Sequence, residues 1–337
     1  MMNRLQKIWQ YLISYRQNKK TLRLLEEGTT TPLYLRHLQK MLHHTIYHKQ
    51  TSEQMLSQMV ISYHSIEKGL AMSEKRYGFG QPKMRALISL CNQYLNQYND
   101  IPSRLSDTLG VIAEYNQLHK AQGFALDEDV QQSIDALLKR TEGHWTLSQT
   151  KHITKQEYFA DIQKSFGQFS ASRHSIRDFD GTIVPKEIMD KAFALAQNAP
   201  SACNRQATRV YAVYDEQIIK QLVDLQNHGR GFADNARPLL VIATELQSWG
   251  NGEEWFGGYL DAGIYMMNLL YALHYHQVAA IPLNWYADES AQQQIHELLN
   301  IPASQEVVAF IACGNPKEEF NLVTSKRRNA NEIVTYF

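Results

Sequence analysis

The hydrophobic pattern of this 337-residue chain changes near residue 155. Before that point apolar residues recur at helical spacing (i, i+3, i+4, i+7), and no convincing strand is found. After it, short apolar runs of strand length alternate with helical patterns. Such an alternation indicates a layered sheet with flanking helices, of the α/β or α+β class. The sequence therefore predicts an all-α N-terminal region over 1–155 and an α/β domain over 156–337.

Local signals place several helices in the first region. One helix is expected to begin at Thr51, which can form a capping box with Gln54, and to end at Gly69 in a left-handed conformation. Pro82 suits the first turn of the next helix. Two further helical stretches are expected over about 103–120 and 127–141.

The first 25 residues carry six Lys and Arg side chains and no acidic one, around an apolar face that includes Leu5, Ile8 and Trp9. A basic amphipathic helix of this kind can lie on an anionic lipid surface or pack on its own protein. Packing is the favoured interpretation, and peripheral membrane contact through this helix is the alternative.

In the second region, β-forming residues and helical periodicity predict alternating elements. Strands are expected at Val210–Tyr214, Leu239–Thr244 and Val307–Cys313, and helices over 185–198, 215–227, 258–276 and 288–299.

Composition excludes several classes of protein. Lys plus Arg and Asp plus Glu both number 34, so no net field favours nucleic acid as a partner. The three cysteines, Cys91, Cys203 and Cys313, are far apart and show no metal-binding spacing, which favours a reducing cytoplasm. The sequence shows neither a signal peptide nor an apolar stretch of the roughly 20 residues that a membrane span needs.

The most informative segment is Ser172–Phe179, which reads SRHSIRDF. If Arg173, Ser175 and Arg177 project the same way, they form a compact anion site. Arginine suits phosphate because its planar fork donates two hydrogen bonds and keeps its charge. Taken alone, the segment is more often a solvated basic loop before a helix than an anion site.

Two later segments add polar and basic groups. Ala199–Gln206, which reads APSACNRQ, follows a predicted helix and offers short hydrogen-bonding side chains for a heterocycle or a ribityl chain. Cys313–Pro316 ends a predicted strand at a glycine, where backbone can approach a ligand closely. Ser325–Arg328 then supplies a second candidate phosphate site, although such a cluster is more often a charged surface.

Motifs of other enzyme classes are not found: there is no dinucleotide-binding G-x-G-x-x-G after a strand, no P-loop and no G-x-S-x-G. His44 and His48 have the spacing of helical metal ligands but no acidic partner, so no metal site is predicted. His274 and His276 are interpreted as packing or surface residues.

Taken in order, the three segments resemble the nitroreductase family of FMN-dependent, NAD(P)H-using oxidoreductases. The similarity continues through Asp261-Ala262-Gly263, a strand near 281–285, and Gly314-Asn315-Pro316, and it covers roughly residues 165–330. It implies the α+β sheet of that family, FMN as the cofactor and a homodimer. One departure is Pro282, which has no N–H to donate to the flavin ring where many members have glycine-rich sequence.

The resemblance implies roles for individual residues. Arg173 and Ser175 would hold the FMN phosphate or ribityl chain, and Arg177 would lie near the N1/C2-carbonyl side of the ring. Ser201 and Asn204 would face the partner subunit's cofactor, and one of the three terminal basic residues would complete the phosphate site. The full set of predicted cofactor-binding residues is Arg173, His174, Ser175, Arg177, Pro200, Ser201, Asn204, Gln206, Lys326, Arg327 and Arg328.

The implied activity is hydride transfer from NAD(P)H through flavin N5 to a small organic acceptor, with no protein residue required as acid, base or nucleophile. Alternatives are flavin-dependent oxidation, flavin chemistry without nicotinamide, and an adaptor whose flavin domain is inactive. The segment His64–Leu70 gathers charged residues at a helix end. It is interpreted as an ordinary helix terminus, with a substrate-binding or flavin-covering element as the alternative.

Overall fold

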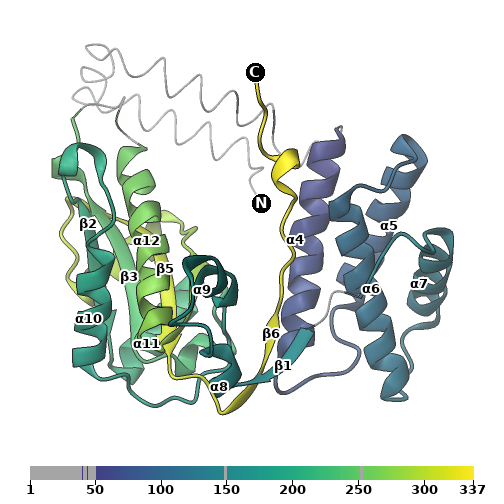
Figure 1. Ribbon diagram of the computed structural model, residues 1–337, viewed down its shortest axis with the longest axis horizontal. Helices are drawn as coiled ribbons and strands as arrows, with labels where there is room; N and C mark the ends of the chain where they lie inside the picture. The colour runs from purple at the N-terminus through teal and green to yellow at the C-terminus, as the bar shows by residue number, and fades with distance from the viewer. Residues whose placement is uncertain (1–39, 41–43, 45–50, 148–149, 251–253, 255) are drawn as a thin grey trace.

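The computed structural model describes residues 40, 44, 51–147, 150–250, 254 and 256–337. The basic helix expected in the first 25 residues, and His48, lie outside these. In the described part, the N-terminal region consists of α-helices that pack on one another, drawn in purple and blue in Figure 1. They are α4 (Ser52–Ala71), α5 (Gln81–Tyr98), α6 (Ser103–Ala121) and α7 (Glu128–Arg140).

These helices share an apolar core. Met59, Tyr94, Leu109 and Tyr115 are at most 1% exposed and belong to one cluster built from the four helices and their connections. The local periodicity predicted α5, α6 and α7, of which α5 and α7 each bury one face and α6 is buried over most of its circumference. The all-α interpretation of residues 51–140 is confirmed.

The two ends of α4 differ in how well the sequence predicted them. The capping box between Thr51 and Gln54 is confirmed, with both reciprocal hydrogen bonds present. The prediction for Gly69 is wrong, because the helix continues to Ala71 and its C-cap, Met72, is extended. Gly69 instead allows close packing, since a Cβ there would lie 2.1 Å from the ring of Phe79.

The C-terminal domain contains a four-stranded sheet in the order β2-β3-β5-β4, with every neighbouring pair antiparallel. The strands are β2 (Thr208–Val213), β3 (Leu239–Glu245), β4 (Ala279–Asn284) and β5 (Gln305–Gly314). The predicted strands are confirmed, and the antiparallel pairing gives the α+β arrangement that the family resemblance implied.

Helices cover both faces of this sheet. Alternate residues of β3 divide between two cores: Leu239 and Val241 face one, and Leu240 and Ile242 the other. Burial of both faces explains why β3 reads as an unbroken apolar run. One core includes α11 (Glu216–Gln226) and α13 (Glu289–Leu299), and the other includes α10 (Lys186–Ala196) and α12 (Gly257–Tyr275).

A second, two-stranded sheet joins the two parts of the chain. Strand β1 (Thr150–Thr154) pairs antiparallel with β6 (Glu319–Val323), close to α4. The sequence predicted no strand at 150–154, where polar residues predominate. Short helices α8 (Lys155–Tyr158) and α9 (Phe166–Ser172) follow β1 and lead into the C-terminal domain.

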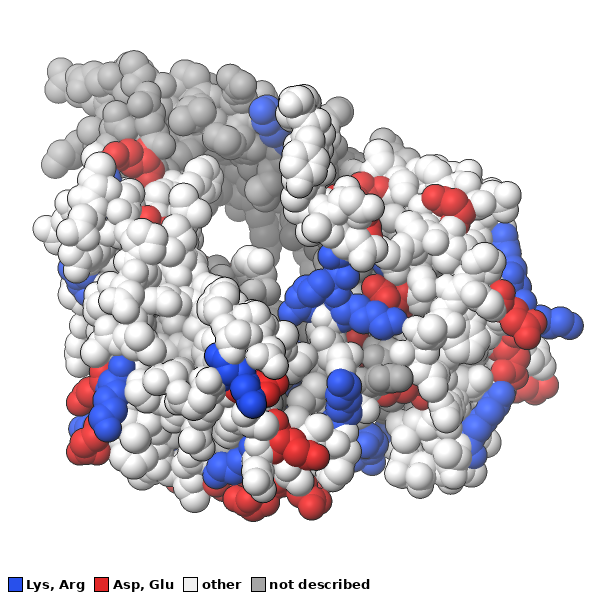
Figure 2. All heavy atoms as spheres, in the orientation of Figure 1, with Lys and Arg blue, Asp and Glu red and all other residues white. Residues whose placement is uncertain are grey.

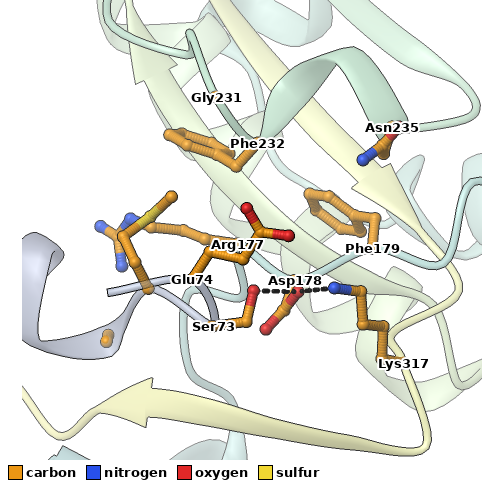
Figure 3. A pocket seen from close by; sticks show the side chains of 11 residues that line it. Ser73, Glu74, Arg177, Asp178, Phe179, Gly231, Phe232, Asn235 and Lys317 are labelled. Carbon is orange, nitrogen blue, oxygen red and sulfur yellow. Dashed lines mark hydrogen bonds and ion pairs between the residues drawn. The ribbon is translucent and has the colours of Figure 1, made fainter. Parts of the chain in front are cut away.

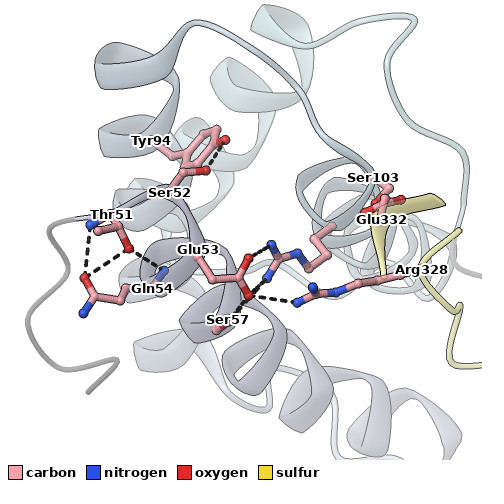
Figure 4. Close-up of polar contacts among 10 residues, drawn as sticks. Thr51, Ser52, Glu53, Gln54, Ser57, Tyr94, Ser103, Arg328 and Glu332 are labelled. Atoms are coloured by element: carbon pink, nitrogen blue, oxygen red, sulfur yellow. Dashed lines mark hydrogen bonds and ion pairs between the residues drawn. The ribbon is translucent and has the colours of Figure 1, made fainter. Parts of the chain in front are cut away.

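Beyond β6 the chain returns to the helical region (Figure 4), and we call this segment, residues 324–337, the strap. Arg328 pairs with Glu53 at 3.1 Å, and Ser103 donates to the Glu332 carboxylate at 2.9 Å. Glu53 also pairs with Arg104, which with Arg328 lowers the pKa of Glu53 to about 2. The two-stranded sheet and the strap both connect the helical region with the C-terminal part of the chain. The domain boundary at residue 155 therefore stays a prediction.

Candidate functional site

A cavity of about 440 Å³ lies between α4 and the C-terminal domain. In the space-filling view, Lys and Arg side chains gather beside the hollow between the two parts (Figure 2). The described residues that line the cavity are Val60, Tyr63, His64, Glu67, Lys68, Arg173, His174, Ser175, Arg177, His228, Ile281, Pro282, Leu283, Asn284, Val323, Ser325, Lys326 and Arg327.

The segment after α9 forms one wall because it is attached to the edge of the sheet. Ser175 makes a parallel bridge with Ala280 of β4, and the Ile176 N–H donates to the Ala280 carbonyl at 3.2 Å. Ile176 is fully buried on the opposite side. Extended backbone alternates its side chains, so Ser175 and Arg177 are directed together toward the cavity.

Arg177 is the most strongly perturbed cation in this wall. Burial lowers the pKa of its guanidinium to about 10, still well above neutral pH, and the charge of Glu67 opposes that shift. Its Nε is buried and has no hydrogen-bond partner in the described structure, while its Cζ lies 5.9 Å from the centre of the Phe232 ring. A buried N–H donor without a partner is suited to a ligand that supplies an acceptor.

The cavity is predominantly cationic. Arg173, Arg177, Lys68 and Arg327 line it, and Glu67 is the sole carboxylate among the described lining residues. Burial, followed by the charge of Arg177, lowers the pKa of Lys68. An enclosed group of cations with so little compensating negative charge favours an anionic ligand.

The structure separates the three terminal basic residues. Arg327 lines the cavity and donates to the Ser325 carbonyl. Lys326 also lines it while pairing with Asp107 at 3.3 Å. Arg328 does not line it and is held by Glu53. Arg327 is therefore the terminal residue best placed for a phosphate, and this assignment stays a prediction.

The loop that contains Pro200, Ser201, Asn204 and Gln206 lies elsewhere and does not line the cavity. Its 3-10 turn η2 (Ala202–Asn204) is fixed to α12 by the Ala202 N–H, which donates to the Asp261 carboxylate at 3.0 Å. The Gln206 N–H donates to Ser201 Oγ at 3.0 Å. Within one chain this loop and the Arg173–Arg177 segment do not meet.

Sequence reasoning missed most of the α4 wall. Tyr63, His64, Glu67 and Lys68 lie on one face of that helix, at positions i, i+1, i+4 and i+5, and all line the cavity. The charged segment His64–Leu70 was the available signal, and its interpretation as an ordinary helix end overlooked this placement. Asn284, from the 281–285 segment of the family resemblance, and His228, which no sequence pattern indicated, line the cavity too.

A second cavity of about 220 Å³ adjoins the first through Arg177, which lines both (Figure 3). At its edge Asp178 accepts from Ser73 Oγ at 3.4 Å and pairs with Lys317 Nζ at 2.7 Å. Ser73 follows α4, so this contact joins the helical region to the C-terminal domain beside Arg177.

Other predicted sites are placed as follows. His274 is 1% exposed, shares a 2.8 Å hydrogen bond with Ser172 Oγ and meets the Tyr158 ring edge to face, which confirms its packing role. Burial lowers the pKa of His274 to about 4. The described residues include no group of three or more potential metal ligands. Nor does the described part contain a helix that is long and apolar enough to cross a membrane.

The C-terminal part of the chain is similar to known proteins. The model of the nitroreductase family matches residues 171–230 and 220–315. A protein of Archaeoglobus fulgidus assigned as an NADH dehydrogenase/NAD(P)H nitroreductase is 26% identical over 148 residues, covering 44% of this chain and 83% of that protein. A protein of Methanothermobacter thermautotrophicus with the same assignment is 24% identical over 179 residues, covering 52% and 88%.

The chain is also similar to solved structures. The NADPH:FMN oxidoreductase of Vibrio harveyi, in complex with NAD⁺, superposes with a TM-score of 0.45 at 20% identity, covering 50% of this chain and 75% of that one. An FMN-dependent nitroreductase of Clostridium difficile superposes with a TM-score of 0.41 at 24% identity, covering 49% and 92%.

Proposed function

We propose that this protein is an FMN-dependent oxidoreductase of the nitroreductase family, whose model matches residues 171–230 and 220–315. It uses NAD(P)H to reduce a small organic acceptor. The observation that carries the proposal is the cationic cavity, which brings the Arg173–Arg177 segment and Arg327 together from distant parts of the sequence.

The residues present fit FMN. Arg173, Ser175 and Arg327 offer charged and neutral donors for one phosphate, which agrees with a mononucleotide. Arg177 has a buried Nε without a partner in the described structure, which suits the acceptor atoms of a flavin ring. Pro282 presents no N–H, so it contributes apolar surface to the cavity and no hydrogen bond.

Each residue has a physical task in this proposal. Bound FMN supplies the hydride chemistry, and the protein supplies binding, orientation and charge. Arg173 and Arg327 anchor the phosphate. Arg177 holds a positive charge in a partly buried site, where it stabilises negative charge that develops on reduction. Helix α4 closes the opposite side and restricts access of water.

The spectrum of the purified protein tests the proposal. We expect a flavin absorption spectrum, release of FMN on heating, and bleaching of the spectrum by NADH or NADPH under anaerobic conditions. Release of FAD, or of no flavin, would contradict the cofactor assignment. Bound FMN that neither nucleotide bleaches would favour oxidation or flavin chemistry without nicotinamide, and absence of any flavin would favour an inactive adaptor.

We also propose that two copies of the chain form the functional unit. Leu260, Ile264 and Met267 make an apolar stripe on α12, with exposed fractions of 65%, 37% and 39%. Asp261, on the same turn as Leu260, holds the 200–206 loop. A dimer formed through this stripe would bury apolar surface and bring Ser201 and Asn204 toward the partner's cofactor.

Replacing Leu260 with arginine should therefore convert the dimer to a monomer and weaken FMN binding, because a charge would be buried in the interface. Light scattering after size-exclusion chromatography measures the change as a halved molar mass. Ile183→Arg is the matched control, since Ile183 is 61% exposed outside α12. A Leu260→Arg protein that stays dimeric would show that the subunits associate elsewhere.

The three cysteines are free, which supports a cytoplasmic location. The balanced charge supports small molecules and a second copy of the chain as partners, and not nucleic acid.

A further inference from the structure

Helix α4 carries a paired histidine and glutamate in the wall of the cationic cavity. His64 Nδ1 lies 3.1 Å from Glu67 Oε2, one helical turn away. The Glu67 side chain is only 4% exposed, whereas that of His64 is 40% exposed and lines the cavity. A carboxylate at Nδ1 favours the proton on that nitrogen and fixes the ring, which leaves Nε2 as the second exchangeable position.

Packing holds this pair in place. Met59, Ile66 and Leu70, on the other side of α4, are at most 3% exposed in the core of the helical region. The capping box at Thr51 fixes the start of the helix. His64 and Glu67 are therefore presented to the cavity from a rigid element, opposite the Arg173–Arg177 segment.

Reduction of an organic acceptor by hydride leaves negative charge on an oxygen or nitrogen of the acceptor, and one proton must be supplied. Besides His64, the titratable and charged side chains that line the cavity are Tyr63, Glu67 and Lys68 on α4 and Arg173, His174, Arg177, His228, Lys326 and Arg327 on the other elements. Arginine does not release protons at neutral pH. Burial, and then the charge of Arg173, lowers the pKa of His174, which favours its neutral form.

Of the three histidines that line the cavity, His64 is the one with a carboxylate partner in the described structure. Such a partner orients the ring toward the cavity. Resting on the proposed function, we propose that His64 is the proton donor to the acceptor and that Glu67 is its positioning residue.

The nicotinamide nucleotide is the ultimate source of the hydride and is oxidised, and the acceptor gains two electrons and one proton with that hydride. The Nε2–H bond of protonated His64 breaks, an O–H or N–H bond forms on the acceptor, and the electron pair stays on Nε2. Water then returns a proton to the neutral imidazole.

Turnover with two different electron acceptors distinguishes proton donation by His64 from a general disturbance of the site. Reduction of 1,4-benzoquinone consumes protons, whereas ferricyanide accepts electrons alone. In His64→Gln we expect quinone turnover to fall about a hundredfold, within the usual range for a general acid. Ferricyanide turnover, flavin bleaching by the nucleotide and the FMN dissociation constant should each stay within about twofold of wild type.

The matched control is His152→Gln, because His152 also lies near a glutamate, 3.4 Å from Glu319, but on β1 outside the cavity. The His152→Gln substitution should change neither quinone turnover nor ferricyanide turnover. Glu67→Gln should lower kcat for quinone with little change in KM and leave ferricyanide turnover unaffected, which a purely structural role would not produce.

Chemical labelling tests, independently of turnover, whether His64 lies at the cofactor cavity. Diethylpyrocarbonate should modify His64 in the FMN-free protein, and added FMN should slow that modification about tenfold while leaving His152 unaffected, as followed by peptide mass spectrometry. Equal losses with both acceptors, unchanged quinone turnover in His64→Gln, or modification that FMN does not slow would each overturn the proton-donor assignment. Wild-type protein that binds no FMN, or that neither nucleotide bleaches, would instead overturn the proposed function itself.

Discussion

Arg177→Gln should lower the midpoint potential of the bound flavin by roughly 60 mV and slow its reduction by the nicotinamide. Losing a donor that stabilises developing negative charge typically costs about 2.7 kcal/mol or more. For a two-electron couple, roughly 30 mV corresponds to about 1.4 kcal/mol. Spectroelectrochemistry of the two proteins measures the shift.

The physical reason lies in the burial of Arg177. Its guanidinium remains charged near neutral pH even though burial lowers its pKa to about 10, and its Nε has no partner in the described structure. A cation in such a site interacts more strongly with the reduced, anionic flavin than with the neutral oxidised ring. Glutamine keeps a hydrogen-bond donor and removes the charge, so oxidised FMN should remain bound.

Arg230→Gln serves as the control, because Arg230 is exposed and pairs with Asp224 away from the cavity. The midpoint potential of the flavin bound to Arg230→Gln should match that of wild type. Equal potentials in Arg177→Gln and wild type would remove Arg177 from the redox role, while leaving the family assignment intact.

Arg173→Ala should weaken FMN binding about tenfold or more without unfolding the protein. A hydrogen bond to a charged group contributes about 1.5–3 kcal/mol, and about 1.4 kcal/mol corresponds to a factor of ten in affinity. Arg173 follows the last turn of α9 and lines the cavity, so removing its side chain leaves the apolar core unchanged. Fluorescence titration of the FMN-free protein gives the dissociation constant.

Arg140→Ala is the comparison for this variant. Arg140 is exposed and donates to the side-chain oxygens of Asn92 and Asn96, outside the cavity. Both variants should melt at nearly the wild-type temperature. An unchanged FMN dissociation constant in Arg173→Ala would show that Arg173 contributes only surface charge.

Local sequence determined the strands of the four-stranded sheet, the helices α10 to α13 that cover it, and the first anion-binding segment, whereas β6 and the short helices α8 and α9 were not predicted. Leu239–Glu245 reads as a strand because both of its faces are buried, and α10 to α13 read as helices because each buries one face. Arg173, Ser175 and Arg177 alternate along five residues, so a single extended segment brings them to one side. Such patterns are complete within a few residues, and sequence alone reveals them.

The tertiary structure decided which distant residues meet at the cavity. His64 and Glu67 lie more than a hundred positions before Arg173, and only the packing of α4 beside β6 places them across from it. Arg327 and Arg328 are adjacent in sequence, yet one lines the cavity and the other is held by Glu53. Gly69 suggested a helix end and instead makes room for the Phe79 ring. In each case the deciding contact is with a residue from another element, and the local sequence holds no information about that contact.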